Sequence, residues 1–287
     1  MRRALKLALI LAVVGVAVFT VSYAAFSALL APKPPRITSP TPRPLHGCRG
    51  LVLIYDSLYR DYPNKTLDEL LVDMFRRHGY CVKMVLGGRA GLVQLAGIGG
   101  YNIVVVRAHA AFNDYLKEYP YGLYVFTGLY WKEAERILGK SKLEDLMRAG
   151  LAAPAVPLTW APRGRVLANL TKYERMAQHM KWYLAVSPRF FESIVTRLNK
   201  TILIFFTCDS ADDRALAGYF LSHGASAYIG WRGKVRPEHL DAALPVLVKY
   251  LLATGSPREA VEKLPTSLRV DEETNATLVA YVGGRSG

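Results

Sequence analysis

The sequence predicts an α/β fold, a three-layer sandwich with a mostly parallel sheet, preceded by an apolar N-terminal segment. Apolar runs rich in β-branched residues recur, each too short for a helix, at 51–55, 81–86, 102–107 and 202–206. Segments with helical spacing separate these runs, which is typical of a parallel sheet covered by helices on both faces. With 287 residues, 51% of them apolar, the chain is long enough to bury the core of one large domain.

The N-terminal segment 7–31 contains no charged side chain and is longer than the roughly 20 residues that cross a bilayer. Basic residues precede it, so the positive-inside rule predicts a single-pass protein of the cell membrane with a cytoplasmic N-terminus and an extracytoplasmic main domain. A cleaved signal peptide is the alternative. The predicted organisation is an anchor within 1–31, a proline-rich spacer at 32–46, and an α/β domain at 47–287.

Cysteines and sequons agree with an exterior location. Cys48 and Cys81 stand at the start of the first two apolar runs, so neighbouring parallel strands would place both thiols at one edge of the sheet. A disulfide there closes a loop of about 33 residues, and an oxidising compartment permits it. The alternative is that all three cysteines are free. Four N-x-T sequons predict glycosylation, at Asn64, Asn169, Asn199 and Asn275.

Other partners are not expected from the composition. The formal net charge is +14, but the basic residues are scattered and do not alternate with aromatic residues, so we expect no nucleic acid. No histidine has neighbours at metal-ligand spacing, which predicts no metal site. The glycine-rich stretch 87–91 lacks the residue order of a phosphate-binding loop, so we expect a loop and a short helix there and not a nucleotide site.

A histidine and a cysteine each follow a predicted core strand. His109 follows the strand at 102–107, and Cys208 follows the strand at 202–206. Ser210 begins an S-x-x-D capping signal, so a helix is expected directly after Cys208, and its dipole would lower the pKa of the thiol. Ligands bind at the carboxyl edge of such sheets. If the two strands are neighbours, the imidazole can act as general base for the thiol. The alternative is that Cys208 is a small buried hydrophobe.

The order of these residues resembles the caspase-like cysteine peptidases, closest to the CHAT, gingipain and clostripain branches. After Cys208 come a helix, Gly224, a strand that ends at Trp231, and the motif LLATGSPREA at 251–260. The resemblance implies a six-stranded parallel-type sheet in which the histidine follows the third strand and the cysteine the fourth. It further implies hydrolysis of a peptide or protein substrate through a thioester, with His109 and Cys208 as the dyad and without metal or cofactor.

Three further residues are assigned by this resemblance to the oxyanion hole or to substrate binding. Ala110 stands where family members usually have glycine after the histidine, and it keeps the backbone N–H donor. Asp209 is a candidate for recognising a basic substrate side chain, with the alternative that the acids near Cys208 complement the helix dipole. Trp231, at the end of the strand that follows Gly224, is the third residue assigned in this way. Because alanine replaces the usual glycine at position 110, a catalytically silent site stays open as the alternative to an active one.

Residues at about 114–198 separate the histidine and cysteine segments and are predicted to be an insertion that partly covers the site. The aromatic residues Trp160, Trp182 and Tyr183 either line a substrate groove or belong to the core. The pattern predicts a strand or hairpin at 121–129, helices at 132–138, 142–148 and 174–183, and a closing strand or hairpin at 268–270 and 277–282.

Three functions follow from these observations. The first is an anchored extracytoplasmic cysteine endopeptidase, and the second is a caspase-fold binding or scaffold domain with a silent site. The third is an unrelated α/β enzyme such as an esterase, for which the sequence contains no G-x-S-x-G elbow.

Overall fold

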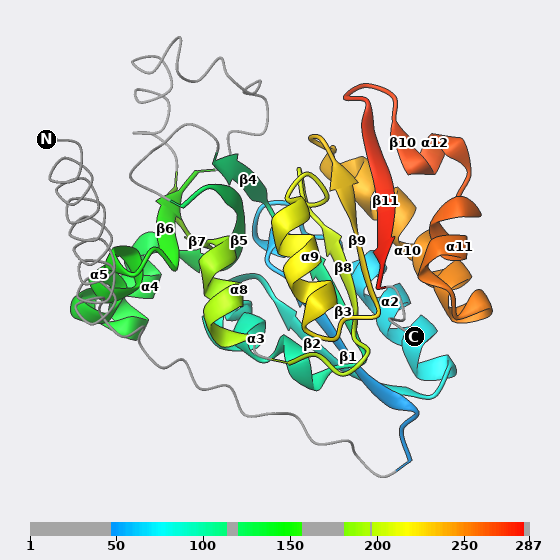
Figure 1. The fold of residues 1–287 in the computed structure, drawn as a ribbon, viewed down its shortest axis with the longest axis horizontal. Coiled ribbons are helices and arrows are strands. Elements are labelled where there is room, and N and C mark those ends of the chain that lie inside the picture. The colour runs from blue at the N-terminus through cyan, green and yellow to red at the C-terminus, as the bar shows by residue number, and fades with distance from the viewer. Residues whose placement is uncertain (1–46, 114–119, 157–180, 196, 284–287) are drawn as a thin grey trace, which may run out of the picture.

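The computed structural model describes residues 47–113, 120–156, 181–195 and 197–283 (Figure 1). The predicted anchor and spacer at 1–46, the sequon at Asn169 and the aromatic residue Trp160 lie outside the described residues. Within the described ranges, every helix is too short or too polar to pass through a bilayer.

The main sheet is mostly parallel, as predicted. Its seven strands lie in the order β10-β11-β9-β8-β3-β1-β2, and only β11 runs opposite to the others, antiparallel to both β10 and β9. Their bounds are β1 Gly50–Asp56, β2 Tyr80–Leu86, β3 Ile103–Arg107, β8 Ile202–Phe206, β9 Ala227–Arg232, β10 Val270–Asp271 and β11 Ala276–Val282. Strands β3 and β8 are neighbours, although the insertion separates them in the sequence.

Helices cover both faces, which makes the three layers that the sequence predicts. Alternate residues of β3 point to opposite faces, so Val104 and Val106 pack in one apolar cluster while Ile103 and Val105 pack in another. The first cluster is covered by α3 Leu92–Ala96, α8 Pro188–Ile194 and α9 Arg214–Ser222. The second is covered by α2 Lys65–Arg77, α10 Pro237–Thr254 and α11 Pro257–Glu262. Four short helices complete the main domain: η1 Leu58–Arg60, η2 Gly87–Arg89, η3 Ile98–Gly100 and α12 Thr266–Arg269.

The segment between β3 and β8 builds a second sheet, drawn mostly in green in Figure 1. It is four-stranded and antiparallel, in the order β4 Ala110–Asn113, β5 Gly122–Tyr130, β7 Tyr183–Val186 and β6 Ala152–Ala155. The predicted strand at 121–129 and the first two predicted helices are confirmed as β5, α4 Trp131–Leu138 and α5 Lys140–Arg148. Residues 174–180 of the predicted helix at 174–183 lie outside the described residues, and its end is wrong, because Tyr183 is extended and pairs with Tyr130.

Two local predictions need correction or completion. Helix α9 begins at Arg214 and its N-cap is Asp213, whose carboxylate accepts a hydrogen bond from the Leu216 N–H. Ser210 does not cap the helix. Its hydroxyl donates to the Phe205 carbonyl at 2.8 Å and accepts from the Trp231 N–H at 2.9 Å, because that buried donor needs an acceptor. The closing hairpin is confirmed as β10 and β11, whereas 268 and 269 lie in α12.

The predicted disulfide between Cys48 and Cys81 is present, with the two Cα atoms 5.6 Å apart. Parallel pairing brings the cysteines together because β1 and β2 begin side by side, with Leu51 opposite Cys81. The glycine-rich stretch folds as predicted, into the single turn η2 followed by the short helix α3.

Candidate functional site

The candidate site lies at the carboxyl edge of the main sheet, between β3 and β8. The last residues that these strands pair are Arg107 and Phe206, and His109 and Cys208 each lie two residues further along. The Ala108 N–H still approaches the Phe206 carbonyl at 3.5 Å before the chain after β3 crosses to the second sheet. The two candidate residues therefore leave the sheet on neighbouring strands and at the same level.

Cys208 is buried and its thiol faces the apolar cluster on the α10 side. The residue is 8% exposed, it is not part of a disulfide, and its Sγ donates to the carbonyl of Val235 at 3.4 Å. Burial raises the pKa of the thiol to about 11, so it is protonated at neutral pH. The expectation that a helix dipole lowers this pKa is wrong, because α9 begins only at Arg214.

His109 is held by the loop after β1. Its Nε2 lies 3.0 Å from Oδ2 of Asp61, and its ring packs against the rings of Tyr62, Phe126 and Tyr183. Among the described residues, no hydrogen bond joins His109 to Cys208. The structure thus brings their strands together but directs the two side chains to different partners.

Asp61 and Tyr183 complete the surroundings of the histidine. The Tyr183 hydroxyl donates to Asp61, with 2.7 Å to each carboxylate oxygen. Burial alone would raise the pKa of Asp61, but the hydrogen bonds from His109 and Tyr183 outweigh it and hold that pKa below its ordinary value. Because Asp61 is ionised, Nε2 of the neutral imidazole carries the hydrogen and Nδ1 is left as the proton acceptor.

Sequence reasoning missed Asp61 as a member of the site and named Tyr183 only as a groove or core residue. A signal for Asp61 was available, because it follows the first core strand and so reaches the same carboxyl edge as His109 and Cys208. No comparable signal marks Tyr183. Its approach to Asp61 depends on how the second sheet docks against the loop after β1.

The other residues assigned by resemblance lie nearby in different settings. Ala110 begins β4 and pairs with Val125. Asp209 is 2% exposed, has a left-handed φ of 57°, and its N–H donates to the Gly233 carbonyl at 2.8 Å. Trp231 is fully buried against Phe206, so its indole is part of the core. Trp182, for which the sequence predicts a place in a substrate groove or in the core, is 41% exposed and so is not a core residue.

A cluster of buried charged side chains lies at the ends of β1 and β3, next to the candidate site. Arg107, 1% exposed, donates from Nη1 to both oxygens of Asp56, and from Nε and Nη2 to Asp241 of α10. Asp68 of α2 is 2% exposed, and neither of its carboxylate oxygens accepts a hydrogen bond from a donor among the described residues. Burial, followed by the charge of Asp56, raises the pKa of Asp68 to about 7.

This raised pKa predicts a pH-dependent stability. Below about pH 4 the Asp68 carboxyl is protonated in both states. As the pH rises to about 7, the unfolded chain releases the proton and the folded chain keeps it, so stability falls through that window. Replacing Asp68 with asparagine is therefore expected to raise the free energy of unfolding by roughly 2 kcal/mol at pH 8 and to leave it nearly unchanged at pH 4. Urea unfolding of the parent and the variant at both pH values measures this difference in the free energy of unfolding.

The matched control is Asp73→Asn, since Asp73 lies on the same helix with its side chain 47% exposed. It is expected to change stability by less than about 0.5 kcal/mol at either pH. Equal effects of Asp68→Asn at pH 4 and pH 8 would contradict the assignment.

The sequons differ in their surroundings. Asn64 caps α2 and its Nδ2, the atom that would carry a glycan, donates to Asp241 at 2.9 Å. Asn199 and Asn275 are exposed. Glycosylation at Asn64 would therefore break a contact to the buried cluster, whereas the other two described sites are accessible.

Among the described residues, no three His, Cys, Asp or Glu side chains are placed to hold a metal ion. The carboxylates of Asp56 and Asp241 are occupied by Arg107. The edge of the sheet carries three groups that can take part in chemistry: the protonated thiol of Cys208, the imidazole of His109 oriented by Asp61, and the hydroxyl of Tyr183 bound to the same carboxylate. The sequence matches no protein-family model and no curated protein, so the chemistry of the site is argued from its geometry.

Proposed function

We propose that the α/β domain is a caspase-like cysteine peptidase in which Cys208 is the nucleophile and His109 the general base. The observation that carries the proposal is the pairing of β3 with β8, which puts the two residues at the same level of the sheet edge. This is the arrangement that the family resemblance implies for its histidine and cysteine. The second support is the imidazole held by Asp61, whose Nδ1 has no hydrogen-bond partner within the described ranges.

The proposed reaction starts when the thiol leaves the Val235 carbonyl and gives its proton to His109. The Sγ–C bond then forms at the scissile carbonyl, the C–N bond breaks, and the proton passes to the leaving amine. Water hydrolyses the resulting thioester, which returns the thiol and releases the acid product. Asp61 acts on this sequence through His109, as a positioning residue that keeps the proton on Nε2.

The resting position of the thiol favours a second candidate, a binding or scaffold domain with a silent site. A thiol with a pKa of about 11 that donates to a backbone carbonyl inside an apolar cluster is a poor nucleophile at neutral pH. In this reading, the cysteine and histidine are structural and the insertion presents a surface to a partner.

Hydrolysis of fluorogenic peptides by the full-length chain tests the first proposal. We expect Cys208→Ala to abolish turnover and His109→Ala to lower kcat about a hundredfold or more, the usual contribution of a general base. His78→Ala is the matched control, because His78 is an exposed histidine at the end of α2. Asp61→Asn should lower kcat and shift its pH profile, which a purely structural role would not do.

Alkylation of Cys208 by iodoacetamide separates the two candidates. If His109 activates the thiol, His109→Ala slows labelling at pH 7 while His78→Ala does not. If the site is silent, both variants label like the parent, and the rate rises about tenfold per pH unit toward a pKa of about 11. That second result, with no peptide turnover, would overturn the peptidase proposal.

We further propose that the domain is held outside the cell membrane by residues 7–31. The Cys48–Cys81 disulfide supports an extracytoplasmic location, since such bonds persist in oxidising compartments.

A further inference from the structure

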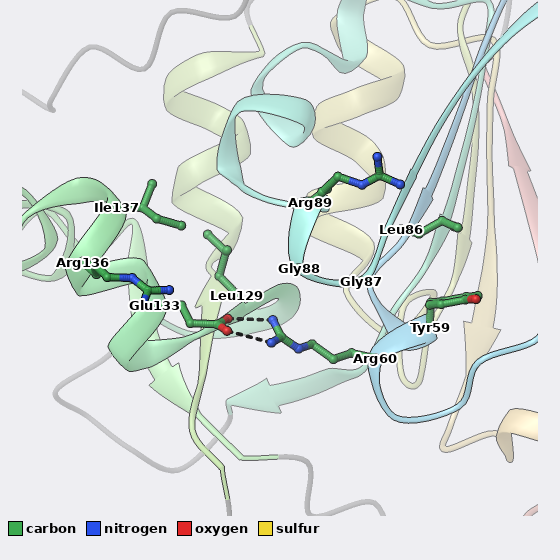
Figure 2. A pocket seen from close by; sticks show the side chains of 10 residues that line it. All are labelled: Tyr59, Arg60, Leu86, Gly87, Gly88, Arg89, Leu129, Glu133, Arg136 and Ile137. Carbon is green, nitrogen blue, oxygen red and sulfur yellow. Dashed lines mark hydrogen bonds and ion pairs between the residues drawn. The ribbon is translucent and has the colours of Figure 1, made fainter.

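A cavity of about 650 Å³ opens beside the candidate site, between η1, η2 and helix α4 of the insertion (Figure 2). Three arginines and one glutamate contribute to its lining: Arg60, Arg89, Arg136 and Glu133. Leu86, Leu129 and Ile137 add an apolar part. The glycine-rich stretch, which carries no role in the proposed peptidase, forms one wall.

This wall is held firmly against β5. The carbonyl of Ala90 accepts two hydrogen bonds of 2.7 Å, from the Tyr55 hydroxyl and from the Gly128 N–H. At Gly128 a side chain would collide with the backbone carbonyl of Gly87, so the loop and the strand are in closest contact there. This wall of the cavity is therefore in place before any ligand arrives, which reduces the ordering cost of binding.

One of the three arginines is already neutralised. Arg60 makes a bidentate ion pair with Glu133, at 2.6 and 2.7 Å, and lies over the Tyr130 ring at 3.8 Å. A side chain at position 88 would bring its Cβ to 2.9 Å from Nη1 of Arg60, so the guanidinium would have to shift. The Arg60–Glu133 ion pair thus adds no net charge to the lining of the cavity.

The charges of the other two arginines are less fully balanced: the hydrogen bond from Arg60 is the main cause that lowers the pKa of Glu133, and the charge of Arg136 adds to it. Neither Arg89 nor Arg136 forms an ion pair with any residue in the described part of the chain, and both are exposed. Figure 2 shows Arg136 and Arg60 extending toward Glu133 from opposite sides, while Arg89 extends from η2 in the direction away from Arg136 and Glu133. The lining therefore carries a net charge of about +2, beside Ile137, which is 62% exposed.

We infer that this cavity binds a small organic anion, a carboxylate or phosphate group carried on an apolar body. Guanidinium groups bind planar or tetrahedral oxyanions through paired hydrogen bonds, so Arg136 would bind the anionic oxygens, while Arg89 adds positive charge from the opposite wall. Leu129 and Ile137 would contact the apolar body. We do not expect the ligand to be a nucleotide, because the glycine-rich stretch 87–91 lacks the residue order of a phosphate-binding loop.

Calorimetric titration of the full-length chain with phenyl phosphate and with benzoate tests the inference and shows which anion is preferred. We expect saturable binding that weakens about tenfold or more in the double variant Arg89→Ala/Arg136→Ala. Lys132→Ala is the matched control, because Lys132 is an exposed cation on α4 that does not line the cavity. It should bind both anions like the parent, and benzyl alcohol should bind more weakly than either.

Three results would overturn the inference: no saturable binding of either anion, an unchanged affinity in the double variant, or an equal loss in Lys132→Ala, which would indicate only general charge attraction. The inference does not rest on the proposed peptidase. Cys208→Ala is expected to bind the anions normally, so the two proposals fail independently.

Discussion

Replacing Arg107 with methionine is expected to lower the free energy of unfolding by about 3–5 kcal/mol at pH 7. The guanidinium is 1% exposed and pairs with Asp56, which is 1% exposed, and with Asp241, which is 16% exposed. Methionine fills a similar volume but leaves these carboxylates without their cation. The cost is therefore mainly that of unpaired charge in the interior, and not that of an empty space.

Chemical denaturation of the full-length chain measures this effect, with Arg77→Met as the matched control. Arg77 pairs with Asp73 one turn away on α2, and its side chain is 77% exposed, so the control should change stability by less than about 0.5 kcal/mol. The Arg107→Met defect should shrink toward pH 4, because burial raises the pKa of Asp56 and its protonation removes an unpaired buried charge. A defect no larger than that of the control, or one independent of pH, would show that the cluster is not held by Arg107.

Removing the Cys48–Cys81 disulfide is expected to lower the free energy of unfolding by about 3–4 kcal/mol. The bond closes a loop with a sequence separation of 33 residues and joins the start of β1 to the start of β2. Among the described strands, β2 lies at the edge of the sheet and pairs with β1 alone. Without the bond, the unfolded chain gains conformational freedom and β2 loses a covalent tie to the sheet.

The variant Cys48→Ser/Cys81→Ser tests this by denaturant unfolding and by hydrogen exchange. We expect faster exchange of the β2 amides than of the β8 amides, since β8 lies between β3 and β9. Reductant should destabilise the parent and leave the variant unchanged. A parent that reductant does not affect would contradict the predicted contribution of the bond.

Several features of the fold could be predicted because they depend on local pattern. The β-branched runs at 102–107 and 202–206 become β3 and β8 because strands buried on both faces need apolar residues at every position. The pairing of Cys48 with Cys81 follows from two consecutive parallel strands, whose starts lie at one edge. The closing hairpin follows from two extended runs separated by a polar turn.

The second sheet was only partly predictable. Strands β4 and β6 have four residues each, too few to show a period, and they are stabilised by pairing with β5 and β7 from distant parts of the chain. The same dependence explains Tyr183, whose place in β7 follows from its partner Tyr130 and not from its neighbours in the sequence.

For the site, the sequence placed His109 and Cys208 at the ends of core strands, and the structure shows those strands side by side. Only the tertiary structure decided which partners the side chains take: Asp61 for the imidazole, the Val235 carbonyl for the thiol, and Arg107 for the buried acids beneath them. The physical reason is that strand positions follow from local burial patterns, whereas these partners come from loops and helices distant in the sequence. Their contacts exist only once β1, β3, β8 and α10 have packed in register.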